Sequence, residues 1–443
     1  MFANARTMGN DASIHQHKLS SNANSCRQSR IVELSSIVAS NTLKLDQYFA
    51  SAGVPTPSFD IDAPVNIPLP PDLESLRESI LDASTELNEL LLGPRETMVD
   101  WQFNYYVPLH AISHYKLAHT FPVGEEASFE DIAEKSGLST PLVRRLLRHA
   151  IANRIFKEVR KGVVAHTAMS RLLAEDTLFQ DYVATGEDTL RATSYTVRAM
   201  LKYPGSEEPG QTGFSLGEGS DDSFYQIMAS DPRRAERFMN CMIMKLQGPG
   251  YDVEHLAGYS LWETLPAGST VVDVGGSHGE VASAIAKRYP SLKFIVQDLE
   301  ATVDVHTHLS DPLEGRIRFM AHNFFQPQPV KGADAYILRW ILHNWPDKYC
   351  LKILRNLIPA LKTGARILIN ESCLPEPNTM PNRADRKLRV NDTLMLTLFN
   401  SQERDEEEWI DLFRRTDQRF RFVGMSTPEG ANLSTLEFEW APV

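Results

Sequence analysis

From residue 256 onward, short apolar runs alternate with amphipathic segments. The apolar runs have the length and composition of strands buried on both faces, and they lie at 270–274, 293–296, 318–320, 335–338 and 366–369. Residues 280–288, after the first run, repeat their apolar positions with the spacing of a helix. This alternation predicts an α/β domain with a mostly parallel sheet.

The first half of the chain has helical patterns instead. Residues 31–52 are weakly amphipathic, and a proline-rich linker follows at 54–71. We predict a long amphipathic helix at 75–92 that ends at Gly93. The segment 98–116 is unusually aromatic, which predicts burial either in the core or against a second subunit.

Residues 128–151 have the pattern of two short helices joined by a turn, and residues 154–168 alternate like a hairpin. Together they predict a winged-helix unit. One interpretation is DNA recognition by the second helix, which carries Arg144, Arg145 and Arg148. The other is that the winged helix serves as a scaffold. The acidic chain and its enzyme-like second half favour the scaffold.

A further helical segment at 224–246 has one face rich in methionine and phenylalanine, after a loop-like stretch at 204–222. The residues on this face are Met228, Phe238, Met239, Met242 and Met244. Such a stripe is typical of a core, but soft apolar side chains also suit a flat aromatic substrate. The pattern alone leaves both interpretations open.

Composition and charge narrow the class of protein. A chain of 443 residues is long enough for two domains, and 42% hydrophobic with 23% charged residues is typical of soluble globular proteins. The net charge of −12 argues against a nucleic-acid partner and against binding to an anionic membrane. The sequence contains no apolar run of the ~18 residues that a membrane span needs.

The first 30 residues are rich in Ser, Asn and Gln and have no signal-peptide core, which predicts a disordered tail. The four cysteines are scattered without CxxC spacing, so we expect no metal site and a cytoplasmic protein with reduced thiols. The predicted organisation is a tail at 1–30, a helical and winged-helix domain at 31–255, and a catalytic domain at 256–443.

The first predicted strand of the second domain runs into a glycine-rich turn at 275–279, and Asp298 ends the next strand. This is the βαβ arrangement of a Rossmann-like domain. The turn lacks the G-x-G-x-x-G spacing of dinucleotide sites and has the form D-x-G-x-S-x-G, beginning at Asp273. Asp273 suits the ammonium group of S-adenosylmethionine, and Asp298 suits its ribose hydroxyls. We therefore favour S-adenosylmethionine over a dinucleotide as the cofactor.

Three stretches of sequence, at 338–361, 366–377 and 401–413, indicate a particular family of proteins. They resemble the small-molecule O-methyltransferase family of the caffeic-acid type, above all its fungal branch that acts on aromatic polyketides. The resemblance extends from residue 75 to the C-terminus. It implies a seven-stranded, mostly parallel sheet, a winged-helix dimerisation domain, an intertwined homodimer and methyl transfer to a hydroxyl of an aromatic or polyketide-type small molecule.

The resemblance also implies the site. His343 matches the family's catalytic base, and Glu371 and Glu403 match the acids that flank it. Residues that match cofactor-binding positions are Asp273, Gly275, Gly276, Asp298, Leu299, Asn323, Phe324 and Arg339. Residues that match positions lining the substrate pocket are Phe238, Met242, Trp340 and Met395.

The proposed chemistry needs these residue types. A phenol with a pKa of about 10 is a poor nucleophile at neutral pH, and a histidine with a pKa of about 6.5 is the usual side chain to take its proton. A carboxylate on the far ring nitrogen, from Glu371 or Glu403, would fix the tautomer and stabilise the imidazolium.

Four residues depart from the family pattern. Ser277 replaces a glycine, Asn323 an aspartate, Arg339 a lysine, and Asn344, after the base, an aspartate. These changes bear on cofactor affinity and leave the reaction class in place. A rival function on the same fold is dehydration or pericyclic ring formation, with the cofactor bound but unspent. The sequence does not identify the substrate.

Overall fold

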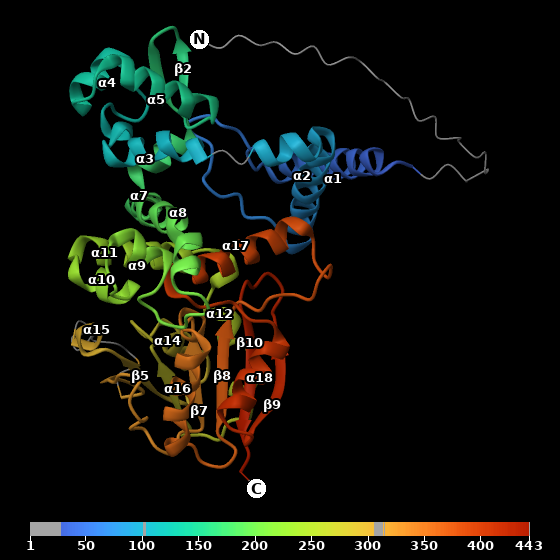
Figure 1. Ribbon diagram of the computed structural model, residues 1–443. Coiled ribbons are helices and arrows are strands. Elements are labelled where there is room, and N and C mark those ends of the chain that lie inside the picture. The colour runs from blue at the N-terminus through green and yellow to red at the C-terminus, as the bar shows by residue number, and fades with distance from the viewer. Residues whose placement is uncertain (1–27, 101–102, 305–312, 314, 443) are drawn as a thin grey trace, which may run out of the picture.

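The computed structural model describes residues 28–100, 103–304, 313 and 315–442, so most of the predicted tail lies outside the described residues. Figure 1 shows an α/β part at one end of the molecule and a helical part at the other. Helix α17 (Asn382–Phe399) lies where the two parts meet.

The α/β part is built on a seven-stranded sheet with the order β6-β5-β4-β7-β8-β10-β9. The strands are β4 (Thr270–Val274), β5 (Lys293–Asp298), β6 (Ile317–Ala321), β7 (Ala335–Arg339), β8 (Arg366–Glu371), β9 (Phe420–Ser426) and β10 (Ser434–Trp440). Strands β4 to β8 pair in parallel, and β10 runs antiparallel to both of its neighbours. The predicted mostly parallel seven-stranded sheet is confirmed.

Two apolar cores cover the faces of this sheet. On one face, α14 (Glu280–Arg288), α12 (Glu254–Ala257) and α13 (Leu261–Thr264) bury side chains such as Ile285 and Trp262. On the other face, α16 (Asp347–Leu357) and α18 (Glu406–Thr416) bury Leu354 and Trp409. Each aliphatic side chain buried in this way contributes about 1.5–3 kcal/mol. Because both faces are covered, the middle positions of the central strands are apolar, and polar residues such as Asp273 and Glu371 lie at or near their carboxyl ends.

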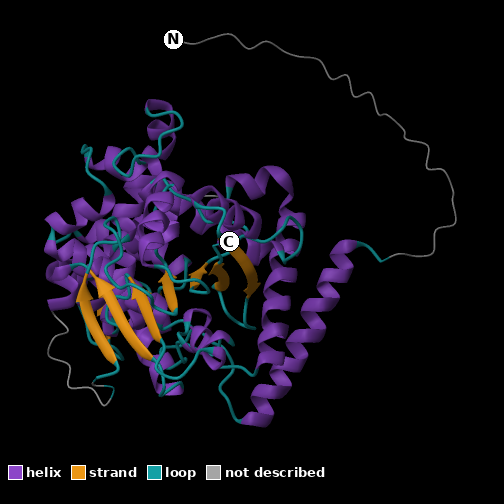
Figure 2. Cartoon of the chain, turned by 90° about the horizontal axis from the view of Figure 1, so that it is seen from below, coloured by secondary structure: helices purple, strands orange, loops and turns teal. Residues whose placement is uncertain are grey.

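Two long helices begin the described chain and lie side by side (Figure 2). They are α1 (Arg30–Ala52) and α2 (Pro71–Val99). The predicted end of the second helix at Gly93 is confirmed, because α2 consists of two helical stretches that meet at this residue. Gly93 takes φ 73° and ψ 172°, which kinks the helix, and helical residues resume at Pro94, whose ring favours the first turn of a helix.

The predicted winged-helix unit is present. It comprises β1 (Glu126–Ser128), α4 (Phe129–Ser136), α5 (Thr140–Ala152), β2 (Phe156–Arg160) and β3 (Val163–His166). Ser128 and Asp131 cap α4 reciprocally, and Gly137 ends it with φ 74°. Arg148 of α5 is paired with Glu158 at 2.8 Å, so the pairing offsets part of the positive charge of this helix.

The aromatic segment is only partly buried within one chain. It contains η1 (Phe103–Tyr105) and α3 (Tyr106–His114). The next element, η2 (Leu117–His119), begins just after it. Tyr105 and Tyr115 are 49% and 43% exposed. Burial of these two rings in the chain's own core is therefore wrong, and their burial against a second subunit stays a prediction. Trp101 lies outside the described residues.

The chain then passes through a layer of helices that reaches the sheet. They are α6 (Ala168–Glu175), α7 (Thr177–Ala184), α8 (Gly186–Lys202), α9 (Gly213–Glu218), α10 (Phe224–Ser230) and α11 (Pro232–Leu246). Two predictions need correction here. The expected loop at 204–222 contains α9, and the expected single helix at 224–246 is two helices. The break falls where Asp231 caps the backbone N–H groups of Arg233 and Arg234, with Pro232 opening the new helix.

Shorter elements complete the fold: η3 (Pro249–Tyr251), α15 (Glu300–Asp304), η4 (Leu342–Asn344) and η5 (Ile358–Ala360). Among the helices that the structure describes, none is both long and apolar enough to cross a membrane.

Candidate active site

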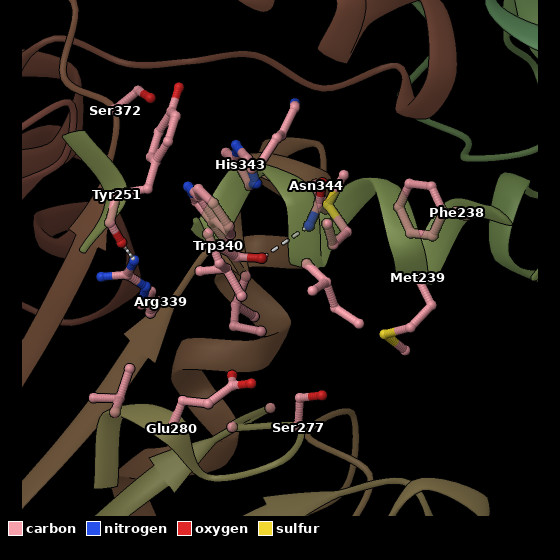
Figure 3. Close-up of a pocket in the computed structure, with 18 of the residues that line it drawn as sticks. Phe238, Met239, Tyr251, Ser277, Glu280, Arg339, Trp340, His343, Asn344 and Ser372 are labelled. Atoms are coloured by element: carbon pink, nitrogen blue, oxygen red, sulfur yellow. Dashed lines mark hydrogen bonds between the residues drawn. The ribbon is translucent and has the colours of Figure 1, made fainter. Parts of the chain in front are cut away.

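A cavity of about 310 Å³ lies between the carboxyl ends of β4, β7 and β8 and the helices α11 and α17. Ligand sites of α/β proteins form at this edge of the sheet because several strands end there together. Nine of the residues predicted for the site line it: Asp273, Gly275, Gly276, Arg339, His343, Phe238, Met242, Trp340 and Met395. Figure 3 shows His343, Trp340 and Phe238 around this cavity.

His343 is held from behind by a carboxylate. It belongs to η4, which follows β7, and its Nδ1 lies 3.0 Å from Oε1 of Glu403. The same carboxylate oxygen accepts a hydrogen bond from Nδ2 of Asn391 at 2.5 Å, and the backbone N–H of Glu403 donates to Asp392 at 2.9 Å. Because Glu403 engages Nδ1, Nε2 is the nitrogen left to act on a molecule in the cavity.

Glu371 has a different set of contacts. Its Oε1 accepts hydrogen bonds from the backbone N–H groups of Ile341 and Leu342 at 2.8 and 2.9 Å. Its Oε2 lies 3.8 Å from Nδ1 of His343 and has no hydrogen-bond partner, although it is fully buried. Glu371 therefore fixes the backbone that carries the histidine, and Glu403 makes the hydrogen bond to the ring.

The two acids change the electrostatics of the histidine. Burial acts to lower the pKa of His343, but the charge of Glu371 together with the hydrogen bond and charge of Glu403 outweighs it, so the pKa is raised. Burial in turn raises the pKa of Glu371 to about 7, although the His343 charge acts to lower it. The environment favours the imidazolium form that a general base becomes after it accepts a proton.

The glycine turn beside β4 leaves room for a ligand and no room for side chains. A Cβ at Gly276 would lie 2.5 Å from Cγ of Asp273, and one at Gly275 would lie 2.4 Å from Cδ1 of Ile341. Asp273 is 1% exposed, and its Oδ2 has no partner. Burial raises the pKa of its carboxyl to about 7, despite the opposing charge of Arg339. An ammonium group bound here would supply the missing partner, so these residues fit S-adenosylmethionine.

Asp298, at the end of β5, is oriented by its neighbours. Its Oδ2 accepts from the backbone N–H of Ser277 at 3.0 Å, and its Oδ1 accepts from that of Leu299 at 2.8 Å. Ser277 reaches Asp298 with φ 48°, in the left-handed region that the family's usual glycine adopts freely. The turn and the end of β5 are thus joined into one unit.

Arg339 is bound to protein groups. It donates to Oδ1 of Asn370 at 2.7 Å and to the carbonyl oxygen of Tyr251 at 2.6 Å, the second bond being drawn in Figure 3. Its guanidinium lies 5.3 Å from the ring centroid of Trp340. This arginine forms part of the cavity wall and holds the indole in place.

Six predicted site residues do not line the cavity. Glu371 and Glu403 lie behind His343. The other four lie at the carboxyl ends of β5 and β6 or just after them: Asp298, Leu299, Asn323 and Phe324. Oδ1 of Asn323 accepts from the backbone N–H of Phe325 at 2.9 Å. Leu299 is 58% exposed. The cofactor roles of these four residues stay predictions.

The apolar wall comes from α11 and α17. Met239 and Met242 of α11 line the cavity, whereas Met228 of α10 is packed in a core. The predicted methionine-rich residues are therefore divided between a core and the cavity wall, and their contact with a substrate stays a prediction. Sequence reasoning missed Asn391 and Lys245, which also line the cavity. Asn391 lies four residues before Met395 on α17, so helical spacing from that predicted pocket residue could have found it.

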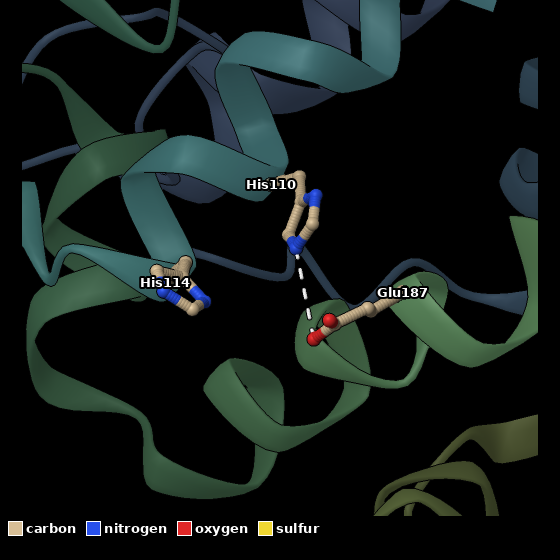
Figure 4. Close-up of side chains that lie close together, drawn as sticks. All are labelled: His110, His114 and Glu187. Carbon is tan, nitrogen blue, oxygen red and sulfur yellow. Dashed lines mark ion pairs between the residues drawn. The ribbon is translucent and has the colours of Figure 1, made fainter.

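One group of possible metal ligands lies elsewhere in the described part of the chain. His110 and His114 of α3 and Glu187 of α8 place donor atoms within 4.8 Å of one another, and Nε2 of His110 is 3.7 Å from Glu187 (Figure 4). These residues line a different cavity from the one that His343 lines. The expectation of no metal stays a prediction.

The glycine turn, the acids at the strand ends and the buried histidine define a methyltransferase with a Rossmann-like domain. Residues 102–176 match the O-methyltransferase dimerisation domain, and residues 207–419 match the O-methyltransferase domain. The chain is 40% identical to O-methyltransferase kk1A of Curvularia clavata over 94% of this chain and 99% of that protein. It is 37% identical to chlorophenol O-methyltransferase of Trichoderma longibrachiatum over 93% and 91% of the two chains.

The chain therefore belongs to the O-methyltransferase family, and it is an S-adenosylmethionine-dependent O-methyltransferase. Solved structures show the same fold. OxaC in complex with sinefungin and meleagrin covers 93% of this chain and 98% of its own, with a TM-score of 0.72 and 19% identity. LepI in complex with SAM covers 92% and 99%, with a TM-score of 0.67 and 22% identity.

Proposed function

We propose that this enzyme methylates a phenolic hydroxyl of a flat, largely apolar aromatic molecule, with His343 as the general base. The observation that carries the proposal is the contact of 3.0 Å between His343 and Glu403 at the wall of a cavity that also contains the glycine turn. The relatives are fungal O-methyltransferases, and one of them is named for a grayanic acid biosynthesis cluster. A secondary-metabolite substrate is consistent with these names.

In the proposed mechanism, Nε2 of His343 accepts the proton of the substrate hydroxyl. Glu403 holds the ring through Nδ1, and the two buried carboxylates stabilise the positive charge that the ring acquires. When bound, S-adenosylmethionine supplies an electrophilic methyl group. The enzyme's remaining task is to place the hydroxyl oxygen in line with that group and to remove its proton.

The cofactor would be held at the turn that joins β4 to α14. Asp273 and the bare glycine backbone would receive its amino-acid end, and Asp298 its ribose hydroxyls. The apolar side chains of α11 and α17 would close over the aromatic substrate and exclude water. Exclusion of water strengthens the electrostatic effect of Glu371 and Glu403 on the base.

Product analysis tests this proposal. The purified enzyme is incubated with S-adenosylmethionine and a panel of phenols, and both products are quantified by mass spectrometry. We expect a methyl ether and S-adenosylhomocysteine in equal amounts. A rearranged or dehydrated product with the cofactor unspent would contradict methyl transfer and support the rival pericyclic or dehydration function.

We also propose that the working enzyme is a homodimer. The dimerisation-domain match begins at residue 102 and covers most of the aromatic segment at 98–116. Large apolar side chains just before the match are exposed, including Leu91 at 69% and Met98 at 74%. Exposed apolar groups gathered in one region are typical of an interface. The cytoplasmic location stays a prediction from cysteine usage.

A further inference from the structure

A lysine lies on the cavity-facing side of α11. Phe238, Met242 and Lys245 are spaced by four and three residues, which places them on one face of the helix. All three line the active-site cavity. Two apolar side chains of α11 thus face the cavity, and the next position on the same helix face is a cation.

The ammonium group of Lys245 has no hydrogen bond or ion pair among the residues that the structure describes. The lysine is half-buried. The carboxylates that line the same cavity are Asp273 and Glu280, and Figure 3 shows Glu280 at the glycine-turn end, away from His343. Lys245 and His343 line the same cavity, and the positive charge of Lys245 acts to lower the pKa of His343.

This cation has a physical consequence for substrate binding. While the cavity is open, water can solvate the ammonium group. A neutral apolar molecule that filled the cavity would remove this water and leave the charge without a partner, which is costly. A molecule with an anionic oxygen at that position would replace the water with an ion pair. Lys245 thus discriminates by penalising neutral substrates as well as by attracting charged ones.

We infer that Lys245 forms an anion subsite, and that the substrate carries an anionic oxygen on its aromatic ring system near the hydroxyl that is methylated. The oxygen belongs to a ring carboxylate or to an ionised phenol. This inference rests on the proposed function of the cavity, and it adds the charge of the substrate to its flat, apolar shape.

The alternative role for Lys245 is structural. A lysine in the last turn of a helix interacts favourably with the helix dipole, and Lys245 lies in the last turn of α11. A structural role predicts lower thermal stability when the lysine is replaced. It predicts no change in the preference between an acid and its neutral ester.

Binding measurements separate the two roles. The full-length enzyme is saturated with S-adenosylhomocysteine, and calorimetry compares hydroxybenzoates and hydroxynaphthoates with their methyl esters. A second pair, 4-nitrocatechol and 4-ethylcatechol, compares an acidic phenol, one of whose two adjacent hydroxyls is ionised near neutral pH, with an ordinary phenol of similar shape. For at least one kind of pair, we expect the wild type to bind the anionic member at least about tenfold more tightly than the neutral member. A charge-assisted hydrogen bond is strong enough to give this ratio.

Lys245→Met should reduce this ratio to near one, and Lys245→Arg should retain most of it. Lys287→Met is the matched control, because Lys287 is exposed in the last turn of α14 and the substitution removes the same charge. The ratio is measured within each variant, so lower stability alone does not change it. An unchanged ratio in Lys245→Met would overturn the inference, as would a wild type that prefers neither acids nor acidic phenols.

The same pairs distinguish the failure of this inference from the failure of the proposed function. Methyl ether and S-adenosylhomocysteine from esters and acids at equal rates would retain methyl transfer and refute the subsite. Lysine-dependent binding of the acids with the cofactor unspent would retain the subsite and refute methyl transfer.

Discussion

At the scale of single residues, the site depends on how two carboxylates divide their tasks around one imidazole. Glu403 makes the hydrogen bond to Nδ1, and Glu371 binds the backbone N–H groups just before the histidine. Both charges stabilise the protonated ring. The histidine is thereby placed, oriented and made a stronger base by separate contacts.

Replacement of His343 by Ala should impair the chemistry and spare the cofactor. General-base catalysis is typically worth about 10²–10⁴-fold, so kcat for an ordinary phenol should fall by about that factor. The measurement is single-turnover methylation, and calorimetry with S-adenosylhomocysteine on the same variant is the control. A wild-type rate with an ordinary phenol would contradict the base assignment.

The pH dependence of kcat should report the charge on Glu403. The pKa of His343 is raised, and the base must be neutral to accept a proton, so kcat should rise with pH through a range above that of an ordinary histidine. Glu403→Gln removes a negative charge that raises this pKa. Its pH–rate profile should therefore shift to lower pH, while the maximal kcat falls because the imidazolium loses its stabilising charge.

The control for this shift is Glu280→Gln, which removes a carboxylate from the other end of the cavity. It should leave the position of the profile unchanged. Coincident profiles for wild type and Glu403→Gln would mean that Glu403 does not influence the titration of the base.

Asp298→Ala should weaken binding of S-adenosylhomocysteine by about 1–3 kcal/mol, the range for polar groups left without a partner. The loss has two sources, because Asp298 is proposed to bind the ribose and also accepts the N–H of Ser277. Calorimetry measures the change. An unchanged affinity would remove Asp298 from the cofactor site.

At the scale of elements, side-chain caps stabilise the first turns of the helices. The side chain of Ser128 accepts the N–H of Asp131 at the start of α4, whereas Ser139 at the start of α5 makes no such hydrogen bond. The two serines occupy the same position in neighbouring helices. Their difference in contacts allows a matched comparison.

Ser128→Ala should lower the free energy of unfolding by about 0.5–2 kcal/mol, the usual cost of losing an N-cap. Ser139→Ala should cost less, because no side-chain hydrogen bond is lost. Chemical denaturation of both variants checks the order. Equal losses would show that the capping box does not stabilise α4.

The kink at Gly93 also acts at this scale. It separates the two helical stretches of α2, and Glu89, just before it, pairs with Arg386 of α17 at 2.9 Å. Helix α17 in turn carries Asn391 and Met395 into the cavity. Helix α17 thus contacts α2 at one end and lines the active-site cavity further along.

At the scale of the whole molecule, two copies of the chain are proposed to assemble through the region around the aromatic segment. The proposed homodimer should bury more than the ~1,600 Å² of a standard interface, because interwoven partners share more surface. Light scattering of the wild type should give the mass of a dimer at micromolar concentration. A monodisperse monomer would contradict the proposal.

A variant with Leu91→Glu and Met98→Glu should dissociate into monomers, since it buries two charges in the proposed interface. Val423→Glu is the control, because Val423 is also exposed but lies on β9 at the edge of the sheet. It should remain a dimer. If both variants stay dimeric, the region around Leu91 and Met98 is not the interface.

The sequence by itself was sufficient for the five parallel strands of the sheet, the glycine turn and the helix at 280–288. The two antiparallel strands, β9 and β10, were implied only by the family resemblance. Buried parallel strands are continuous apolar runs, and a glycine turn is required where any side chain would clash, as at Gly276. These are local constraints that short stretches of chain express. The winged-helix unit followed for the same reason, from the cap at Ser128 and the break at Gly137.

Only the tertiary structure decided which side chains meet. His343 and Glu403 are 60 residues apart, and nothing in either stretch shows that Glu403 rather than Glu371 would bind Nδ1. Asn391 and Lys245 share helix faces with Met395 and Met242, but helical spacing alone does not show that these faces line a cavity. They became site residues because α17 and α11 pack over the strand ends with those faces inward. Contacts between distant segments depend on the packing of whole elements, which local patterns do not encode.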